Sequence, residues 1–219
     1  MSHLWSLIIS TVSKSPVKNL IFDLGGVILD LSVDHTLESF ARLARIPKQK
    51  VVDLFDSSPG FNEYEKGGMT NEDFRDYIRK IYQVNASDQD IDTSWNAMLR
   101  GLPVVKLNLL QRLKTTYSVY LLSNTNDIHL SYINSTMLPA VTGENSLDVY
   151  FHKAYYSHRM LKRKPDAEIF EQVLEENRLA PEQTLFFDDN ALNIAGAKEV
   201  GIQTIHVTSP GLILDYFHE

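Results

Sequence analysis

The sequence predicts an α/β fold, a doubly wound parallel sheet with an inserted α-helical domain. Short apolar runs typical of buried strands recur along the chain, and helical patterns lie between the last four of them. About 95 residues with helical patterns only separate the first run from the second. A parallel crossover needs far fewer residues, so this stretch predicts a helical insertion into the sheet domain.

The order of the elements follows from these patterns. The strands are expected at residues 20–24, 119–123, 153–157, 185–188 and 204–207. Helices of the insertion are expected at 34–45, 48–55, 71–82 and 88–99, and the later helices at 102–116, at 166–178 and from about 191. We therefore expect a sheet domain made of residues 17–33 and 101–219, and a helical domain made of residues 34–100.

Several helix ends carry their own signals. Thr70 stands three residues before Asp73 and predicts a variant of the capping box. Pro103 and Pro165 suit the first turns of two helices, and Gly201 suits the end of the last one.

Composition excludes several classes of function. At 219 residues and 43% hydrophobic content the chain can bury a full core. A net charge of −7 without a long Lys or Arg run argues against a nucleic-acid partner and against a membrane surface. Without cysteine there is no disulfide and no thiolate metal site, so any metal must use oxygen or imidazole ligands.

Location is predicted only weakly. Residues 4–9 are apolar, but no Lys or Arg precedes them and no small-residue cleavage site follows, so we do not expect a secretion signal. No apolar run approaches the length of a membrane span. A cytoplasmic protein, monomeric or homodimeric, is the expectation.

The pentad Phe22-Asp23-Leu24-Gly25-Gly26 places a carboxylate at the tip of the first strand and follows it with glycine. Such a carboxylate can be a nucleophile or a metal ligand, and glycine lets a substrate approach the backbone closely. By itself the pentad fits an ordinary strand-ending turn equally well.

Three later segments point to the same sheet edge. Ser123 and Asn124 end the second strand, where a ligand can bind or where a helix is simply capped. Lys164 precedes a proline at a helix start, which favours an anion. Asp188 and Asp189 end the fourth strand, and two adjacent carboxylates repel each other unless a divalent cation compensates them.

Taken in this order, the four segments resemble the motifs of the haloacid dehalogenase superfamily of aspartate-nucleophile hydrolases. The resemblance covers residues 20–207, and the helical insertion lies where this family carries a cap domain. It implies a Rossmann-like core with a helical cap. Bacterial sugar-phosphate phosphatases with the Asp-Leu-Gly pattern are similar along the whole length. The implied activity is Mg²⁺-dependent hydrolysis of a small phosphate ester, such as a sugar phosphate, through an aspartyl-phosphate.

The resemblance also implies roles for single residues. Asp23 would be the nucleophile, Ser123 would bind a phosphoryl oxygen, and Lys164 would neutralise charge. Mg²⁺ would be held by Asp23, the acid pair Asp188 and Asp189, and the Gly25 carbonyl, with Asp189 the direct ligand of the pair and Asp188 a partner of Lys164. We expect the substrate to contact Gly25, Gly26, Ser123, Asn124, Lys164 and, from the helical domain, Glu65.

One departure from the family pattern matters. Its phosphatases usually carry a second aspartate, the general acid and base, where this chain has Gly25. We therefore expect a substrate whose leaving group departs with little protonation, such as an anomeric sugar phosphate, unless another residue such as Glu65 supplies the proton. A 2-haloacid dehalogenase, which needs no such acid, and an inactive phosphometabolite-binding protein remain alternatives.

The segment 61–68 combines aromatic, charged and glycine residues just before a predicted helix. It is expected to form either a loop that closes over the substrate, with Gly67 or Gly68 as a hinge, or an ordinary surface turn. Trp95 is expected in the core of the helical domain.

Overall fold

A computed structural model describes residues 16–217, and the apolar segment 4–9 lies outside the described residues. The central sheet has five parallel strands in the order β5-β4-β1-β6-β7. They are β1 (Asn19–Phe22), β4 (Ser118–Ser123), β5 (Lys153–Tyr156), β6 (Thr184–Asp188) and β7 (Gln203–His206). Each expected strand is present within two residues of its predicted bounds, and the predicted α/β fold class is confirmed.

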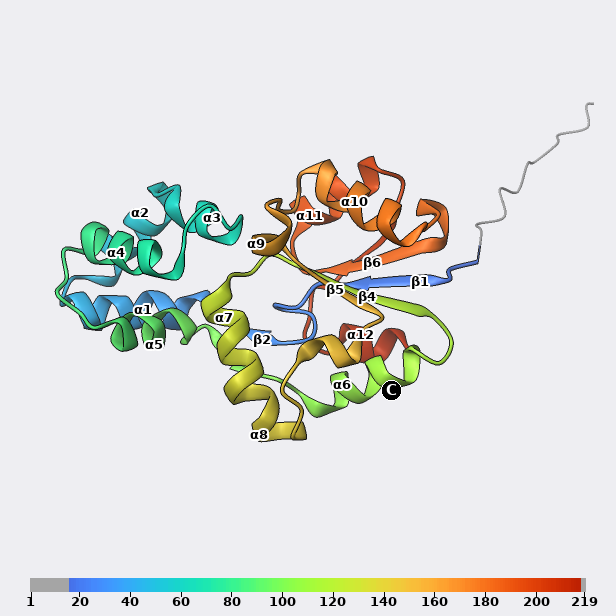
Figure 1. Cartoon of the computed structure of the whole chain (residues 1–219), viewed down its shortest axis with the longest axis horizontal. Coiled ribbons are helices and arrows are strands. Elements are labelled where there is room, and N and C mark those ends of the chain that lie inside the picture. Colours follow the sequence, from blue (N-terminus) through green and yellow to red (C-terminus); the bar gives the residue numbers. More distant parts are fainter. Residues whose placement is uncertain (1–15, 218–219) are drawn as a thin grey trace, which may run out of the picture.

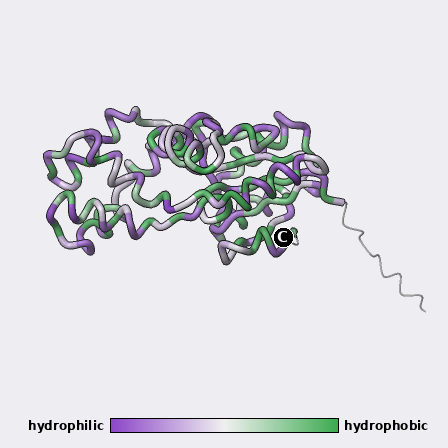
Figure 2. Tube along the Cα trace, turned by 90° about the horizontal axis from the view of Figure 1, so that it is seen from below, coloured by the Kyte–Doolittle hydropathy of each residue, from purple (hydrophilic) through white to green (hydrophobic). Residues whose placement is uncertain are grey.

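Alternate side chains of the strands point to opposite faces of the sheet, and helices cover both faces (Figure 1). Phe22, Leu121 and Phe187 belong to the core on one face, together with residues of α6 (Val104–Leu113) and α12 (Leu212–Tyr216). On the other face, Ile21 and Phe186 pack with α10 (Ala167–Asn177) and α11 (Ala191–Glu199). Figure 2 shows the hydrophobic segments running through the centre of this layered unit.

Shorter helices complete the connections between these strands. They are α7 (Asp127–Tyr132), a π-helix at Ile133–Met137, α8 (Leu138–Thr142), α9 (Ser157–Met160) and two 3₁₀ turns at Leu147–Tyr150 and Pro181–Gln183. Among the described helices, none has both the length and the hydropathy that crossing a membrane requires.

The insertion after β1 forms a separate helical layer, the cap, at one end of the molecule (Figure 1). Its helices are α1 (Val33–Ala44), α2 (Lys48–Ser57), α3 (Gly60–Glu65), α4 (Asn71–Tyr82) and α5 (Asp88–Asn96). The cap has its own aromatic core, in which Phe61, Phe74 and the buried Trp95 are in ring contact. We propose that the cap boundaries are the predicted residues 34 and 100, because α1 begins at Val33 and the return strand ends at Gly101.

Two strands in this region were not expected. β2 (Asp30–Leu31) and β3 (Leu99–Gly101) pair antiparallel where the chain leaves the core and where it returns. Because β3 begins at Leu99, α5 ends at Asn96 rather than at residue 99 as predicted. Such short strands leave almost no periodic pattern in the sequence.

The segment 61–68 begins as a helix, which neither expectation included, and only its last residues form a turn. Residues Gly60–Glu65 form α3, and Phe61 and Tyr64 are buried on one face because they lie three positions apart. The turn that follows contains Gly67 at φ +76°, where an added Cβ would lie 2.2 Å from the carbonyl oxygen of His158. This glycine therefore permits close packing of cap against core.

Local capping signals were mostly read correctly. Thr70 and Asp73 form the reciprocal capping box of α4. Pro103 is the N-cap of α6, and Gly201 follows α11 with φ +83°. Pro165, by contrast, precedes the N-cap Asp166, and its peptide bond with Lys164 is cis.

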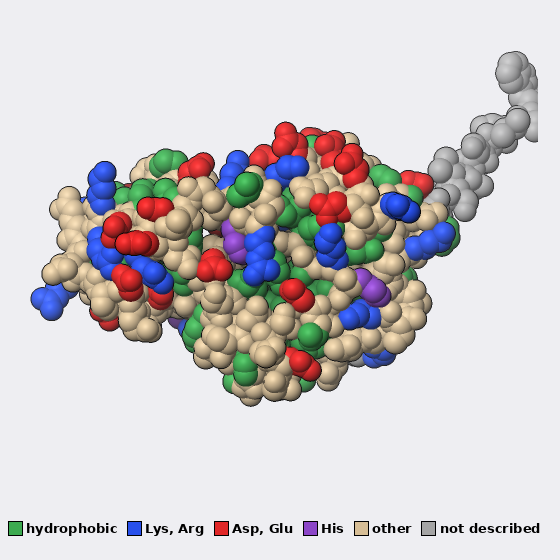
Figure 3. Space-filling model, in the orientation of Figure 1, with side chains coloured by type: hydrophobic (Ala, Val, Ile, Leu, Met, Phe, Trp, Pro, Cys, Tyr) green, Lys and Arg blue, Asp and Glu red, His purple; other side chains and the backbone are tan. Residues whose placement is uncertain are grey.

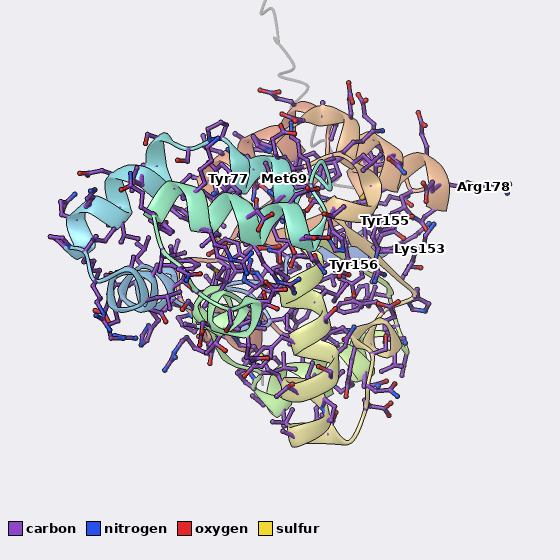
Figure 4. All side chains as sticks on the ribbon, turned by 60° about the vertical axis from the view of Figure 1, so that its left-hand side comes forward. Met69, Tyr77, Lys153, Tyr155, Tyr156 and Arg178 are labelled. Atoms are coloured by element: carbon purple, nitrogen blue, oxygen red, sulfur yellow. The ribbon has the colours of Figure 1, made fainter. Side chains whose placement is uncertain are left out.

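The sheet edge at β5 is protected by charge. The Lys153 Nζ lies 2.6 Å from an Oε2 of Glu176 and 4.8 Å from the centre of the Tyr155 ring. Figure 4 shows Lys153 and Tyr155 together at this outer edge, with Arg178 beyond them, while Met69 and Tyr77 lie on the cap. A lysine on an edge strand opposes pairing with another chain.

Candidate active site

Three neighbouring strands bring the predicted polar residues to one edge of the sheet. Phe22 of β1 is in register with Leu121 of β4 and with Phe187 of β6. Asp23, Ser123 and Asp188 therefore leave their strands side by side. This is the carboxyl edge at which open α/β sheets bind ligands.

Lys164 joins two of these strand ends. Its Nζ lies 2.8 Å from Asp23 Oδ1 and 2.6 Å from Asp188 Oδ2, and its side chain is fully buried. The predicted pairing of Lys164 with Asp188 is present, and Asp23 is a second partner.

Burial and charge set the protonation of this group. Burial raises the pKa of Asp23 to about 7 against the lowering effect of Lys164, and the nearby Asp188 carboxylate adds to the rise. Burial by itself would lower the pKa of Lys164, but Asp23 and Asp188 together raise it. Lys164 is therefore a permanent cation between two acids.

Asp189 adds a third carboxylate from the exposed end of the same edge. Ligand oxygens of Asp23, Asp188 and Asp189 all lie within 4.8 Å of one another. Lys164 is the single ammonium that contacts them among the described residues, so three carboxyl groups face one cation. Hard carboxylate oxygens in excess negative charge suit a divalent cation such as Mg²⁺, so the residues present fit that ion.

Glycine at position 26 is required by this arrangement. Gly26 has φ +72°, and an added Cβ would lie 2.2 Å from Asp189 Oδ2. The backbone of the Asp23 loop can therefore approach the acid pair only without a side chain there.

A cavity of about 150 Å³ extends from this edge toward the cap. Gly25, Ser123 and Asn124 line its core side, so three of the predicted substrate-binding residues share it. Its remaining wall is mainly apolar and comes from both domains, namely Leu24, Leu29, Leu31, Val33, Phe55, Trp95, Met98, Leu99 and Ile133.

Glu65, at the end of α3, brings the one carboxylate among the residues that line this cavity. Its Oε2 accepts a hydrogen bond of 2.9 Å from Arg163, and its main-chain oxygen accepts one of 2.6 Å from the Ser157 hydroxyl. Both partners belong to the core segment that also carries Lys164. The predicted substrate-binding residue of the cap is thus held beside the carboxyl edge of the sheet.

Asn124 also holds the main chain of Lys164, which was not expected. Its Nδ2 donates to the carbonyl of Lys164 at 3.0 Å, and its Oδ1 accepts from the N–H of Lys164 at 2.9 Å. Both amide groups therefore hold the main chain of Lys164, although the residue still lines the cavity.

Sequence reasoning missed residues that orient the site. The buried Asn193 donates its Nδ2 to both oxygens of Asp188, at 3.0 and 3.1 Å, and the N–H of Asn190 donates to Oδ1 at 2.8 Å. Asn190 and Asn193 are three apart at the start of α11, and this spacing after an acid pair was the available signal. No comparable spacing in the sequence pointed to Arg163 or Ser157.

The face in Figure 3 shows the cap and core as two lobes, with acidic and basic side chains interspersed over the cap.

A family model described as haloacid dehalogenase-like hydrolase matches residues 133–207. The chain is 31% identical over 189 residues to D-ribitol-5-phosphate phosphatase of Bacteroides thetaiotaomicron, covering 86% of this chain and 90% of that one. It therefore belongs to the haloacid dehalogenase-like hydrolases.

Solved structures agree with this family. A HAD family enzyme from Bacteroides thetaiotaomicron in complex with magnesium and inorganic phosphate is 38% identical, with a TM-score of 0.79 over 87% of this chain and 93% of that one. A HAD-like family hydrolase from Porphyromonas gingivalis is 26% identical, with a TM-score of 0.81 over 94% and 100% of the two chains.

Proposed function

We propose that this hydrolase is a Mg²⁺-dependent phosphatase of a small phosphometabolite, which acts through an aspartyl-phosphate. The observation that carries the proposal is the arrangement of Asp23 and Asp188 around the buried Nζ of Lys164, with Asp189 beside them. A carboxylate nucleophile next to a fixed cation and an acidic metal site is what phosphoryl transfer requires.

Each residue has a separate task. Asp23 attacks phosphorus and carries the phosphoryl group until water removes it. Lys164 neutralises the charge that gathers on the nucleophile and on the phosphoryl oxygens, and Ser123 donates to one of those oxygens. Asn124 and Asn193 act as positioning residues, because they hydrogen-bond Lys164 and Asp188.

Mg²⁺ is the metal that we assign to the acid cluster. Asp23 and Asp189 would be its direct carboxylate ligands, together with the Gly25 carbonyl, and Asp188 would support them while it holds Lys164. When bound, the ion neutralises phosphoryl charge and orients the ester for in-line displacement. The relative determined with magnesium and inorganic phosphate supports this assignment.

The substrate is a small phosphate ester, and we infer that it is a sugar or sugar-alcohol phosphate. The cavity of about 150 Å³ suits a leaving group no larger than one small sugar or one aromatic ring. The similar phosphatase that acts on D-ribitol 5-phosphate supports this substrate class. A cytoplasmic location agrees with a phosphometabolite as substrate.

The alternative of a haloacid dehalogenase is weaker. Halide needs no proton donor, which fits Gly25, but dehalogenation also needs no metal site. Asp188 and Asp189 beside Asp23 would then be an unexplained surplus of negative charge. An inactive binding protein would have no need of a nucleophile positioned against Lys164.

A hydrolysis screen tests the proposal. Purified protein is incubated with a panel of sugar and sugar-alcohol phosphates, with and without Mg²⁺, and released phosphate is measured, with 2-chloropropionate as the haloacid control. We expect Mg²⁺-dependent phosphate release and no halide release. Halide release, or binding of phosphate esters without turnover, would contradict the proposed function.

A further inference from the structure

Position 25 gives this enzyme no general acid, and the structure shows what occupies that space. A Cβ added at Gly25 would lie 3.1 Å from Cδ2 of Leu31, whose side chain lines the cavity. The apolar side chain of Leu31 therefore occupies the place where the carboxylate of a residue at position 25 would lie. The proton for the leaving group must come from another wall of the cavity.

Among the residues lining the cavity, Glu65 and His129 are the two whose side chains carry a carboxyl or an imidazole group, the groups that most often act as general acids. His129 is excluded by its hydrogen bonds. The Oδ1 of Asn126 accepts from Trp95 Nε1 and from the N–H of His129, so its Nδ2 donates to His129 Nδ1 at 3.1 Å. The proton of the neutral ring then sits on Nε2 and donates to the Trp95 carbonyl at 3.1 Å.

Glu65 has no such restriction. Its Oε2 accepts from Arg163, and no hydrogen bond among the described residues engages its Oε1. Burial raises the pKa of Glu65, while the facing charges of Arg163 and, farther away, Lys164 lower it in part. A carboxyl group with one free oxygen and a nearby guanidinium can exist both protonated and ionised.

We propose that Glu65 of the cap is the general acid and base of the phosphatase reaction, in place of the aspartate that Gly25 lacks. This inference rests on the proposed function. In the first step Asp23 attacks phosphorus, the bond from phosphorus to the ester oxygen breaks, and that oxygen takes the Glu65 proton. In the second step water attacks phosphorus and gives its proton to Glu65, the bond to Asp23 breaks, and inorganic phosphate leaves.

A catalytic residue on the cap also links chemistry to domain contact. Glu65 reaches the cavity only while the end of α3 is held by Ser157 and Arg163. The acid is therefore in place when cap and core are together, and this arrangement excludes bulk water at the same time.

Two esters of nearly the same shape test the proposal, phenyl phosphate and p-nitrophenyl phosphate. Phenolate is the poorer leaving group and needs the proton, whereas p-nitrophenolate does not. In the wild type we expect similar kcat/KM for both. In Glu65→Gln we expect kcat/KM to fall about 10²–10⁴-fold for phenyl phosphate and to change little for p-nitrophenyl phosphate.

The second step gives an independent readout on the same variant. Without a base for the attacking water, Glu65→Gln should release one equivalent of p-nitrophenolate in a burst and then turn over slowly. A matched control is Glu63→Gln, which removes an exposed carboxylate from the same helix. It should behave as the wild type with both esters.

The outcomes distinguish the role of Glu65 from the proposed phosphatase activity. Equal loss on both esters in a folded Glu65→Gln, or no loss, would overturn the role of Glu65 and leave the phosphatase standing. If that variant does not fold, the wild type decides, because a steep preference for p-nitrophenyl phosphate means that no acid assists. A wild type that hydrolyses neither these esters nor any sugar phosphate with Mg²⁺ would overturn the proposed function and this inference together.

Discussion

The carboxylate of Asp23 is attracted by one charged neighbour and repelled by another. Lys164 attracts its carboxylate at 2.8 Å, while burial and the Asp188 charge oppose its ionisation. To stay ionised in such a place, the Asp23 carboxylate needs a further cation beside Lys164, and Mg²⁺ is the ion that carboxylate oxygens suit. The negative charge that makes Asp23 a nucleophile therefore also lowers the stability of the folded state.

Replacing Asp23 with Asn should abolish phosphatase activity without loss of stability. An amide has nearly the same size but is a far poorer nucleophile. Removing the charge also relieves the repulsion from Asp188, which keeps its own contact with Lys164 at 2.6 Å. Phosphate release and the midpoint of thermal unfolding measure both effects. A folded variant with wild-type rates would remove Asp23 from the chemistry.

Replacing Asp189 with Asn should weaken Mg²⁺ binding strongly while the fold is kept. Asp189 is exposed at the sheet edge, so the change disturbs no packing, but it removes a charged ligand from the cluster. Calorimetric titration with Mg²⁺ measures the affinity, with replacement of the exposed Asp215 of α12 by Asn as the control. An unchanged affinity would locate the metal elsewhere.

Helices α5 and α7 meet through one buried network across the two domains. The ring of Trp95 stacks on that of His129 with centroids 4.7 Å apart, and Asn126 joins both residues by hydrogen bonds. The network is fully paired only with a neutral imidazole, since a proton on Nδ1 would face the Asn126 amide group. Burial accordingly lowers the pKa of His129 to about 4, although the Trp95 hydrogen bond opposes this.

Acid should therefore weaken the contact between α5 and α7. His129 has a lower pKa in the folded than in the unfolded state, so the unfolded state binds the proton first as the pH falls. This loss of folding stability is absent above pH 6.5 and grows as the pH falls toward 4. Below that pH it amounts to roughly 3 kcal/mol.

The variant His129→Gln isolates this effect, because an amide can both donate to Trp95 and accept from Asn126 without titrating. The free energy of unfolding from urea denaturation at pH 7.5 and pH 5 is the measurement. We expect a smaller loss between the two pH values in the variant than in the wild type. Equal losses would mean that the imidazole is not held neutral.

For the whole molecule, Mg²⁺ should act as a stabilising ligand. The acid cluster exists only when the ends of β1 and β6 lie side by side, so the metal binds the folded state and not the unfolded chain. At about 100 times its dissociation constant the ion stabilises by about 2.7 kcal/mol. For a chain of this size that raises the unfolding midpoint by roughly 5–10 °C.

Thermal unfolding with Mg²⁺ and with chelator measures the shift, and Asp189→Asn should show little of it. The same shift in that variant would indicate a metal site that does not depend on Asp189.

The amino-acid sequence by itself determined the sheet and the residues at its carboxyl edge. The three central strands β1, β4 and β6 each have a run of buried apolar residues, and the polar residues that matter come directly where those runs stop, so position along the chain predicts position in space. Asp23, Ser123, Asp188 and Asp189 were identified for this reason. Lys164 was identified from its place before a proline and a helix, although nothing local showed that it would be buried.

Only the tertiary structure decided what surrounds that edge. Contacts such as Arg163 with Glu65 and Trp95 with Asn126 join residues 98 and 31 positions apart, and no periodic pattern records such pairs. The short strands β2 and β3 and the helix α3 were missed because their stability comes from packing between domains rather than from local propensity. The cavity, and the carboxylate of Glu65 in its wall, exist because the cap folds back onto the core.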